Sequence, residues 1–475
     1  MPYPYPLPTT SPVAFVPHYT SPVYPSLPLL CTQHRGTLRN LLKAFKRASP
    51  AQQSTQLPQL LQAIETYLPY LLFLQSSLHS GDVLASDSPT PLTTSWRTTL
   101  TAPSFPGAPP KRVEREGLDY EILFVLNTLA YVHTLLARSQ LHDALAPSVQ
   151  TEKKQSLLNT AIQHLLTSSA IFTFAVSLPR PPAASEWPPD LSPAVLSALA
   201  SLSLADATLL AVTKQDPYPT YLLVSSGQGS DSTSLLYAPP APPTGVKALL
   251  LARICIAASS HAEAGTGLLA SSSSRRKRDD EEVVPDLGRY LDSLQKVARA
   301  KCCRFLSIDA EASGRVGEGI GWATLARSIL SPTNTGKLKR EFLERRENKA
   351  LERGDASWGL DAGKLEEGRT LERLEEKWRK SNDAVFFQPV DGANTLAARI
   401  PSGREVHTVK NWEPLTLDPA EKKALLGKSF EGLQEALEEM GWGDSDEEEE
   451  RKGGGTGSMS GGYIGRSATA TPGYY

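Results

Sequence analysis

The sequence contains few of the residues on which disulfide and metal chemistry depend. Only four cysteines occur in 475 residues, and two of them, Cys302 and Cys303, are adjacent. Such a set cannot form the disulfide framework of a small secreted domain, and no CxxC or HxxxH pair accompanies it. We therefore expect reduced, buried thiols, no metal site and no cofactor.

An excess of charge of one sign is also missing. The chain carries 49 Lys and Arg residues against 51 Asp and Glu residues, which gives a net charge of -2. A nucleic-acid-binding protein needs a basic excess or a dense basic face, so no nucleic-acid partner is expected. The basic cluster RRKR at residues 275–278 is followed directly by DDEE. A solvated loop is the favoured interpretation of this segment, and a nuclear-import or acidic-lipid signal is the alternative.

Long hydrophobic runs and a secretion signal are missing as well. The apolar stretch at residues 248–258 is interrupted by Arg253 and is shorter than the roughly 20 residues that span a membrane. The first residues, MPYPYPLPTT, have neither the basic start nor the apolar core of a signal peptide. We expect a cytoplasmic protein that reaches membranes only through its partners.

The motifs of common enzyme classes are incomplete or missing. The stretch GRVGEGIGW at residues 314–322 follows a helical pattern, and Trp322 stands where a dinucleotide-binding fingerprint needs its third glycine. The GKS at residues 427–429 lacks the first glycine of a phosphate-binding loop, because Lys422 occupies that position. No HExxH motif or zinc-spaced cluster occurs. We expect no catalytic residue. A helical enzyme whose residues converge only in space is the alternative from a different class.

Helical periodicity is the dominant pattern in the sequence. Apolar residues such as Leu158, Ala161 and Leu165 recur every three or four positions, as on the buried face of a helix. No strict 34-residue repeat is present, so a regular repeat array is not supported. The pattern predicts a mainly α protein, an irregular helical solenoid built from antiparallel helix pairs. Long helical patterns cover residues 118–145, 151–178, 192–214, 245–269 and 286–307.

Strand-like alternation is scarce and falls late in the chain. It predicts a small β-sheet with one strand at residues 384–389 and further strands at 397–400 and 405–409. Residues 80–117 are rich in Pro, Ser and Thr over most of their length, and they are interpreted as a loop.

Composition also divides the chain. Nine prolines fall in the first 28 residues, which excludes a helix there, and the interleaved apolar residues indicate an arm packed on the body. After residue 442 the sequence turns acidic and then rich in Gly and Ser. The expected organisation is an extended arm over residues 1–30, a domain over 1–415 with loops at 80–117 and 271–284, a C-terminal amphipathic helix over 416–442 and a disordered tail over 443–475.

The order of several segments carries a resemblance to a known family. AIQHLLTSSAIFTFAVS at residues 161–177 is similar to a helix built on an A-x-x-F-x-x-L theme, and LSALASLSLADATLLAVTK at 196–214 to a leucine-rich helix that ends in an LAQAQE-like turn. NDAVFFQPV at 382–390 resembles a short NDFIYH-x-x-P strand. These segments are typical of the Bro-domain family, the Alix and PalA group of endosomal adaptors. The resemblance implies a boomerang-shaped helical scaffold with a tetratricopeptide-like core.

The resemblance also implies a function. Members of the family receive the C-terminal amphipathic helix of an ESCRT-III subunit of the Snf class in an apolar patch, and the nearest matching positions are Ala211, Val212, Leu222 and Leu223. The Pro/Tyr-rich start resembles members that assemble the fungal alkaline pH signalling complex, together with its other components. That complex leads to proteolytic activation of a transcription factor. Recruitment to endosomes or to plasma-membrane-associated foci follows, and general multivesicular-body cargo sorting is the alternative.

A short peptide motif precedes the first helical pattern. Tyr24, Pro25 and Leu27 form a YPxL sequence, whose rigid Tyr-Pro pair and spaced Leu suit a peptide ligand. The favoured interpretation is that the two apolar side chains hold the arm on the helices, because motifs of four residues often occur by chance.

Truncation after Gly441 should leave the melting temperature nearly unchanged, because the removed residues have almost no apolar side chains to bury. Thermal unfolding followed by circular dichroism measures this. A fall of more than a few degrees would show that the tail packs on the body.

Overall fold

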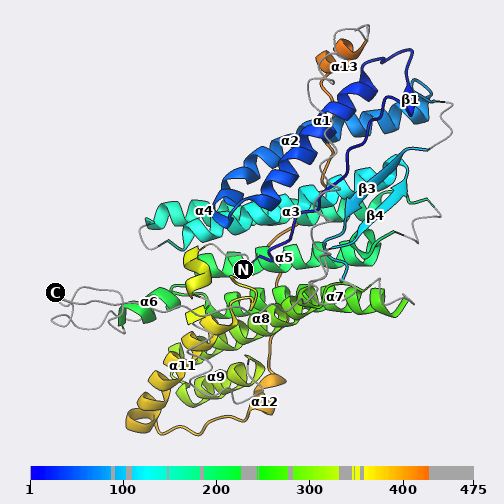
Figure 1. Ribbon diagram of the computed structural model, residues 1–475. Helices are drawn as coiled ribbons and strands as arrows, with labels where there is room; N and C mark the ends of the chain where they lie inside the picture. The colour runs from blue at the N-terminus through cyan, green and yellow to red at the C-terminus, as the bar shows by residue number, and fades with distance from the viewer. Residues whose placement is uncertain are drawn as a thin grey trace, which may run out of the picture. The chain divides into compact units, whose positions relative to one another are not determined.

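Helices form most of the structure, because apolar residues recur at helical spacing along most segments (Figure 1). The computed structural model describes residues 2–86, 91–102, 110–146, 149–181, 187–225, 243, 245–275, 282–330, 345–346, 348–353 and 358–426. The main helices are α1 (Leu27–Arg47), α2 (Pro50–Ser80), α3 (Leu118–Ala144), α4 (Thr151–Ser177), α5 (Pro193–Gln215), α6 (Tyr218–Ser225), α7 (Ala248–Arg275), α8 (Pro285–Ala312), α9 (Val316–Leu330) and α11 (Lys364–Ser381).

Successive helices pack against one another along the chain. α3 packs on α4, α4 on α5, α5 on α7, α7 on α8 and α8 on α9, and Figure 1 shows the stack running from α1 and α2 down to α9 and α11. α1 and α2 form a hairpin against α3, and α11 packs on α9 at the other end. The main helices differ widely in length, from 31 residues in α2 to 8 in α6. The predicted mainly helical class and the irregular helical solenoid are thus confirmed.

The two central helices α3 and α5 are apolar enough to cross a membrane by length and composition alone. In the fold most of their side chains are buried against neighbouring helices. A helix covered on several sides has no polar stripe, because it needs no solvent-facing surface. All four cysteines are likewise buried, and none forms a disulfide.

Two short antiparallel sheets lie in the N-terminal part of the chain. β1 (Tyr19–Thr20) pairs with β2 (Leu84–Ala85), and β3 (Thr93–Arg97) pairs with β4 (Arg112–Glu116). The loop predicted over residues 80–117 is therefore wrong at β2, β3 and β4. The polar and charged sequences TTSWR and RVERE concealed two of these strands, because neither shows an alternation of apolar and polar residues, although Thr94, Ser95 and Trp96 of β3 are buried.

The three strands predicted late in the chain are absent. Asn382–Phe386 is a π-helical turn, Ala393–Ala397 is the short helix α12, and residues 398–418 continue without a strand partner. These last residues pack along helices instead. Partly buried and exposed side chains alternate over residues 407–410, which reproduces the two-residue period of a strand.

Two further predicted boundaries meet the structure only in part. α7 continues to Arg275, so the loop predicted at residues 271–284 begins inside a helix. α13 (Pro419–Leu425) starts within the predicted C-terminal helix, with Asp418 and Glu421 forming its capping box. The remainder of that helix and the predicted tail lie outside the described residues.

We call residues 399–418 the strap, because they connect the two ends of the solenoid. Arg404 N–H donates to Arg253 O of α7 at 3.0 Å, and Glu405 accepts from His261 at 2.9 Å. Further along, the Trp412 ring packs edge-on against Phe174 of α4 with centres 5.0 Å apart. The strap therefore returns the chain from α12 across α7 and α4 toward the α1–α2 hairpin, where α13 begins (Figure 1).

A buried charge network joins α5, α8 and α11. The fully buried Arg304 of α8 donates to Asp216 at 2.5 Å and to Glu367 of α11 at 2.6 Å, and Lys301 donates to Glu367 at 2.7 Å. Burial alone would raise the pKa of Glu367, but Arg304 and Lys301 hold it below its ordinary value. Paired in this way, the charges can stay ionised inside the fold.

The turn after α11 is packed tightly on glycines of α9. Gly317 N–H donates to the Gln388 side-chain carbonyl at 3.0 Å, and the Gln388 amide donates to Gly314 O at 2.8 Å. A Cβ at Gly317 would collide with the Pro389 carbonyl oxygen. The glycine-rich stretch that fails as a nucleotide motif therefore permits close approach of two backbones.

Gly317→Ala should lower the free energy of unfolding by about 1–3 kcal/mol, because the added methyl group overpacks this contact. Gly288→Ala in α8 is the matched control, since a Cβ there meets nothing within 4 Å. The control should be neutral or stabilise the protein by up to about 1 kcal/mol. Urea unfolding compares the two variants, and equal effects would contradict the close-packing role of Gly317.

Candidate functional site

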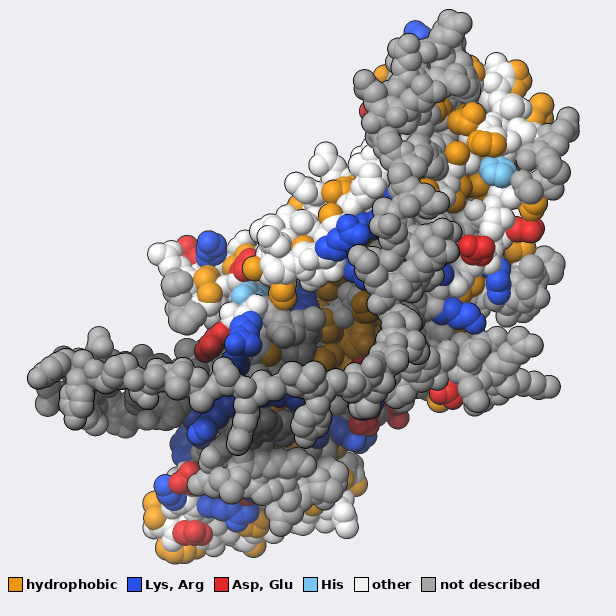
Figure 2. Space-filling model, viewed as in Figure 1, with side chains coloured by type: hydrophobic (Ala, Val, Ile, Leu, Met, Phe, Trp, Pro, Cys, Tyr) orange, Lys and Arg blue, Asp and Glu red, His pale blue; other side chains and the backbone are white. Residues whose placement is uncertain are grey.

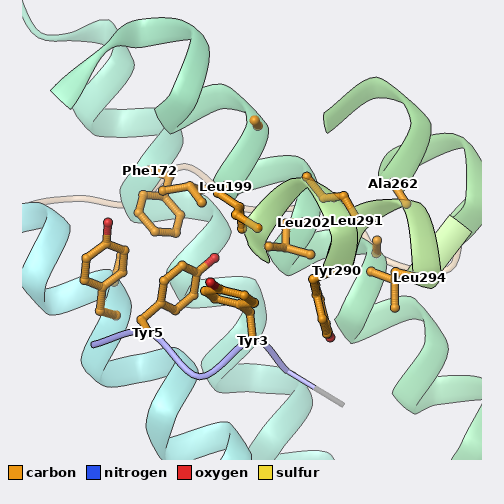
Figure 3. Close-up of a cluster of buried hydrophobic side chains, with 14 of the residues drawn as sticks. Tyr3, Tyr5, Phe172, Leu199, Leu202, Ala262, Tyr290, Leu291 and Leu294 are labelled. Atoms are coloured by element: carbon orange, nitrogen blue, oxygen red, sulfur yellow. The ribbon is translucent and has the colours of Figure 1, made fainter. Parts of the chain in front are cut away.

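The N-terminal arm is fixed in place by buried tyrosines, and it ends at residue 26 and not at residue 30 as predicted, because α1 begins at Leu27. Its prolines prevent helix formation, so the side chains between them are free to point into the body. Tyr3 packs edge-on against Tyr290 of α8 with ring centres 5.3 Å apart, and Tyr5 stacks on Tyr131 of α3 at 4.4 Å. Figure 3 shows Tyr3 and Tyr5 beside Phe172 and among leucines of α5 and α8. The arm thus lies across α3, α5 and α8.

A cleft of about 690 Å³ opens beside the arm. Its walls come from the arm, the α1–α2 corner, the end of β3, the C-terminal half of α3 and Trp358. The face shown in Figure 2 is hollowed, with hydrophobic side chains in the hollow and Lys and Arg side chains beside it. The apolar lining includes Pro4, Pro6, Leu7, Phe45, Leu57, Leu135 and Trp358.

Sequence reasoning did not identify this cleft, because its residues come from segments far apart in the chain. The one signal that pointed toward it was the alternation of Pro with Tyr and Leu at the start of the chain, which predicted a packed arm. Which helices the arm would cross could not be read from that pattern.

The charged lining of the cleft is more basic than acidic. Such a surface favours a partner segment that combines apolar side chains with carboxylates. Among the charged residues, Arg138 donates to Pro2 O at 3.0 Å and to Trp358 O, and its guanidinium lies 4.6 Å from the Trp358 ring centre. The charged residues of the lining are Lys46, Arg97, Arg138, Arg353, Asp143 and Glu352.

A second apolar cluster lies next to the cleft, where α3, α4 and α5 meet. It is separate from the main core, and we call it the end cluster. Two of its members, Ala350 and Trp358, come from outside these three helices and cover them. The end cluster consists of Ala137, Leu141, Ala144, Leu158, Ala161, Ile162, Leu165, Ala207, Leu210, Ala211, Ala350 and Trp358.

The structure buries the positions matched to the family's partner-binding patch. Ala211 belongs to the end cluster, whereas Val212 and Leu222 belong to the main core, and none of the three is more than 7% exposed. The side chain of Leu223 lies outside the described residues. Of these positions, only Ala211 belongs to the cluster beside the cleft. That any of them contacts a partner stays a prediction.

The YPxL residues hold the arm to the α1–α2 hairpin. Leu27 is fully buried as the first residue of α1, and Tyr24 packs edge-on against Phe73 of α2 with ring centres 5.0 Å apart. Pro25 joins them. A ligand that needs both apolar anchors would have to detach this segment from the hairpin, so the packing interpretation fits the geometry better than the peptide-ligand one.

Two histidines meet between α3 and α4. Nδ1 of His133 lies 3.0 Å from Nδ1 of His164, so one ring donates and the other accepts. Burial, and then the neighbouring His164 ring, lower the pKa of His133 to about 3. Such a ring stays neutral at cellular pH and serves as a structural hydrogen bond. Among the described residues, no group of three or more His, Cys, Asp or Glu could hold a metal ion.

An acidic side chain lies beneath the arm. Asp206 of α5 is buried, and its Oδ1 accepts a hydrogen bond from the Tyr290 hydroxyl at 3.0 Å. Burial raises the pKa of Asp206 to about 7, although Tyr290 and Arg138 act in the opposite direction. Its carboxyl group therefore changes charge near neutral pH, at the place where the arm packs on the solenoid.

The comparison with protein families matches the BRO1-like domain to residues 33–433. The chain belongs to the BRO1-like domain family. This confirms the resemblance that the segments at residues 161–177, 196–214 and 382–390 carry.

Relatives of this BRO1-like chain match it over most of its length. The pH-response regulator protein palC of Emericella nidulans is 37% identical over 452 residues, which covers 86% of this chain and 88% of the relative. The palC protein of Cryptococcus neoformans is 27% identical over 470 residues, with 87% and 92% covered. A structure of ALIX in complex with the SIVmac239 PYKEVTEDL late domain shares the fold, with a TM-score of 0.51 at 16% identity. It covers 88% of this chain and 49% of ALIX.

Asp206→Asn should become progressively more stable relative to the wild type as pH rises. The folded-state pKa of Asp206, about 7, lies above its ordinary value of 3.8. The stability that its protonated form contributes is therefore complete below about pH 4 and lost as pH rises through about 7. Between about pH 4 and pH 7, the free energy of unfolding of the variant should rise relative to that of the wild type by at most roughly 4 kcal/mol. Urea unfolding at several pH values measures it, and a difference that does not vary with pH would contradict a protonated, buried Asp206.

Proposed function

We propose that this BRO1-like chain is a non-enzymatic adaptor in ambient pH signalling. The observation that carries the proposal is the 37% identity to a protein named pH-response regulator, which extends over 86% of this chain and 88% of that relative. A match over this share of both chains relates most of each protein, and it is not confined to a short shared motif.

The adaptor works by binding, because the cleft beside the arm suits recognition of a polypeptide. The partner is an ESCRT-III subunit of the Snf class, which presents its C-terminal amphipathic helix. Helix-in-groove recognition requires spaced apolar pockets with polar groups at the rim, and the cleft beside the end cluster offers both. Its basic lining favours a helix with carboxylates on the flanks of the apolar face.

Binding to ESCRT-III recruits the chain to endosomes or to plasma-membrane-associated signalling foci. There it helps to bring together the components whose assembly leads to proteolytic activation of a transcription factor. The solenoid suits this role, since its stacked helices expose a long surface to which several partners can bind at once.

The C-terminal helix of a Snf-class ESCRT-III subunit should bind the purified chain directly. Fluorescence anisotropy with the labelled helix measures the affinity. The matched control is the same helix with two apolar anchors replaced by Asp, which should bind at least about tenfold more weakly, because charge is then placed where apolar groups must be buried. Absence of binding by the unaltered helix would remove the ESCRT-III assignment.

A gene deletion distinguishes a role in pH signalling from a role in cargo sorting. Deletion of the gene should abolish growth at alkaline pH and leave endosomal cargo sorting intact, and both are scored in the same strain. A sorting defect of equal severity would favour a general multivesicular-body adaptor instead.

A further inference from the structure

Part of the end cluster is covered by a segment from elsewhere in the chain. Residues 348–353 are helical and lie far in sequence from α3, α4 and α5. Ala350 is 8% exposed and Trp358 is 4% exposed, and both pack into the end cluster with Leu210 and Ala211. We call residues 348–353 together with Trp358 the internal ligand.

The internal ligand is held by a small number of contacts. Leu351 O lies 2.9 Å from Nε2 of His142, and the Trp358 ring meets the edge of the His142 ring with centres 5.7 Å apart. Arg138 contributes the cation–π contact and the bond to Trp358 O. These attachments all come from one turn of α3, which spaces His142 four residues after Arg138.

The remaining side chains of the short helix face solvent. Asn348, Lys349, Glu352 and Arg353 are exposed, whereas Ala350 is buried and Leu351 partly buried. This pattern is that of an amphipathic helix lying in a groove through a narrow apolar face. A segment of the main core would be enclosed by core side chains. Ala350 and Trp358 belong instead to the end cluster, which is separate from the main core.

The cleft reaches the side of this segment. Glu352, Arg353 and Trp358 line the cleft together with residues of the arm. An incoming helix can therefore place its first side chains in the cleft before the internal ligand leaves. Ala211, the one predicted partner-binding position in the end cluster, belongs to the same buried cluster as Ala350 and Trp358 of the internal ligand.

We propose that the internal ligand occupies the partner site in the free chain and that an amphipathic partner helix displaces it. Displacement of the internal ligand removes the bond from Arg138 to Trp358 O, and a carboxylate of the partner can then accept from this guanidinium beside Pro2 O. The partner is thus an amphipathic helix with small apolar anchors and at least one acidic residue beside them. The proposal rests on the proposed adaptor function and adds its regulation. The affinity of the partner is reduced by the fraction of chains in which the site is covered.

The experiment uses the full chain with Ala350→Asp, which puts a charge on the buried face of the internal ligand. Asn348→Asp is the matched control, since it adds the same charge to an exposed position of the same helix. The first probe is a labelled synthetic peptide of residues 345–358. It should bind the Ala350→Asp variant at least about tenfold more tightly than the wild type or the control, because only that variant leaves the site open.

Hydrogen exchange of the wild-type chain gives a second, independent measurement. Amides of residues 348–353 should exchange through local opening, much faster than those of the central helix α5. If these amides exchange only with global unfolding, the segment is ordinary core and the proposal is overturned. A peptide that binds all three proteins equally, or none of them, overturns it as well, and circular dichroism verifies that each variant is folded.

The second probe is the labelled ESCRT-III helix, which separates this proposal from the adaptor function. Tighter binding of this helix to Ala350→Asp than to the control supports both. Equal binding to all three proteins preserves the partner and overturns the displacement. The ESCRT-III helix could instead bind none of the three proteins while the 345–358 peptide binds Ala350→Asp. That result would support coverage of the site by the internal ligand and contradict the ESCRT-III assignment.

Discussion

The buried carboxylate of Glu121 is the interaction on which the N-terminal half of the structure depends. It is fully buried in α3 and accepts hydrogen bonds from Arg35 Nε of α1 at 2.9 Å, Tyr67 OH of α2 at 3.2 Å and Trp96 Nε1 of β3 at 2.6 Å. Arg35 in turn donates to Ser11 O of the arm at 2.6 Å. A buried charge is tolerated only when it is paired and hydrogen-bonded, so these five elements have to meet at one point.

That constraint determines the path of the arm, and the arm determines the cleft. With Ser11 held at Arg35, the preceding residues run back over α3 and α8, where Tyr3 and Tyr5 are buried. The arm residues that line the cleft, between Pro4 and Thr9, do so without any secondary structure of their own. Its prolines help here, because they reduce the conformational entropy that ordering the segment would otherwise lose.

The other end of the chain packs in a related way on different helices. The strap crosses α7 and α4, and Gly403 permits its backbone to approach within van der Waals contact of Ala257, since a Cβ there would lie 3.0 Å from Ala257 N. Arm and strap both join helices that are distant in sequence. A solenoid in which each helix contacts mainly its neighbours gains long-range cooperativity from such segments.

The sequence by itself determined the helical class, the family and the packed arm. Helical spacing over segments such as residues 151–178 is a local property that survives in any environment, and the ordered family segments depend on residue identity alone. It could not determine where polar ribbons such as β3 and β4 pair, nor that Glu405 packs on α7 and His407 on α5 and not in a sheet. An extended chain shows the same two-residue period against a strand or a helix, so only the tertiary partner decides between them. The cleft and the end cluster, which includes Ala211, Ala350 and Trp358, likewise bring together side chains more than a hundred residues apart, which no local pattern does.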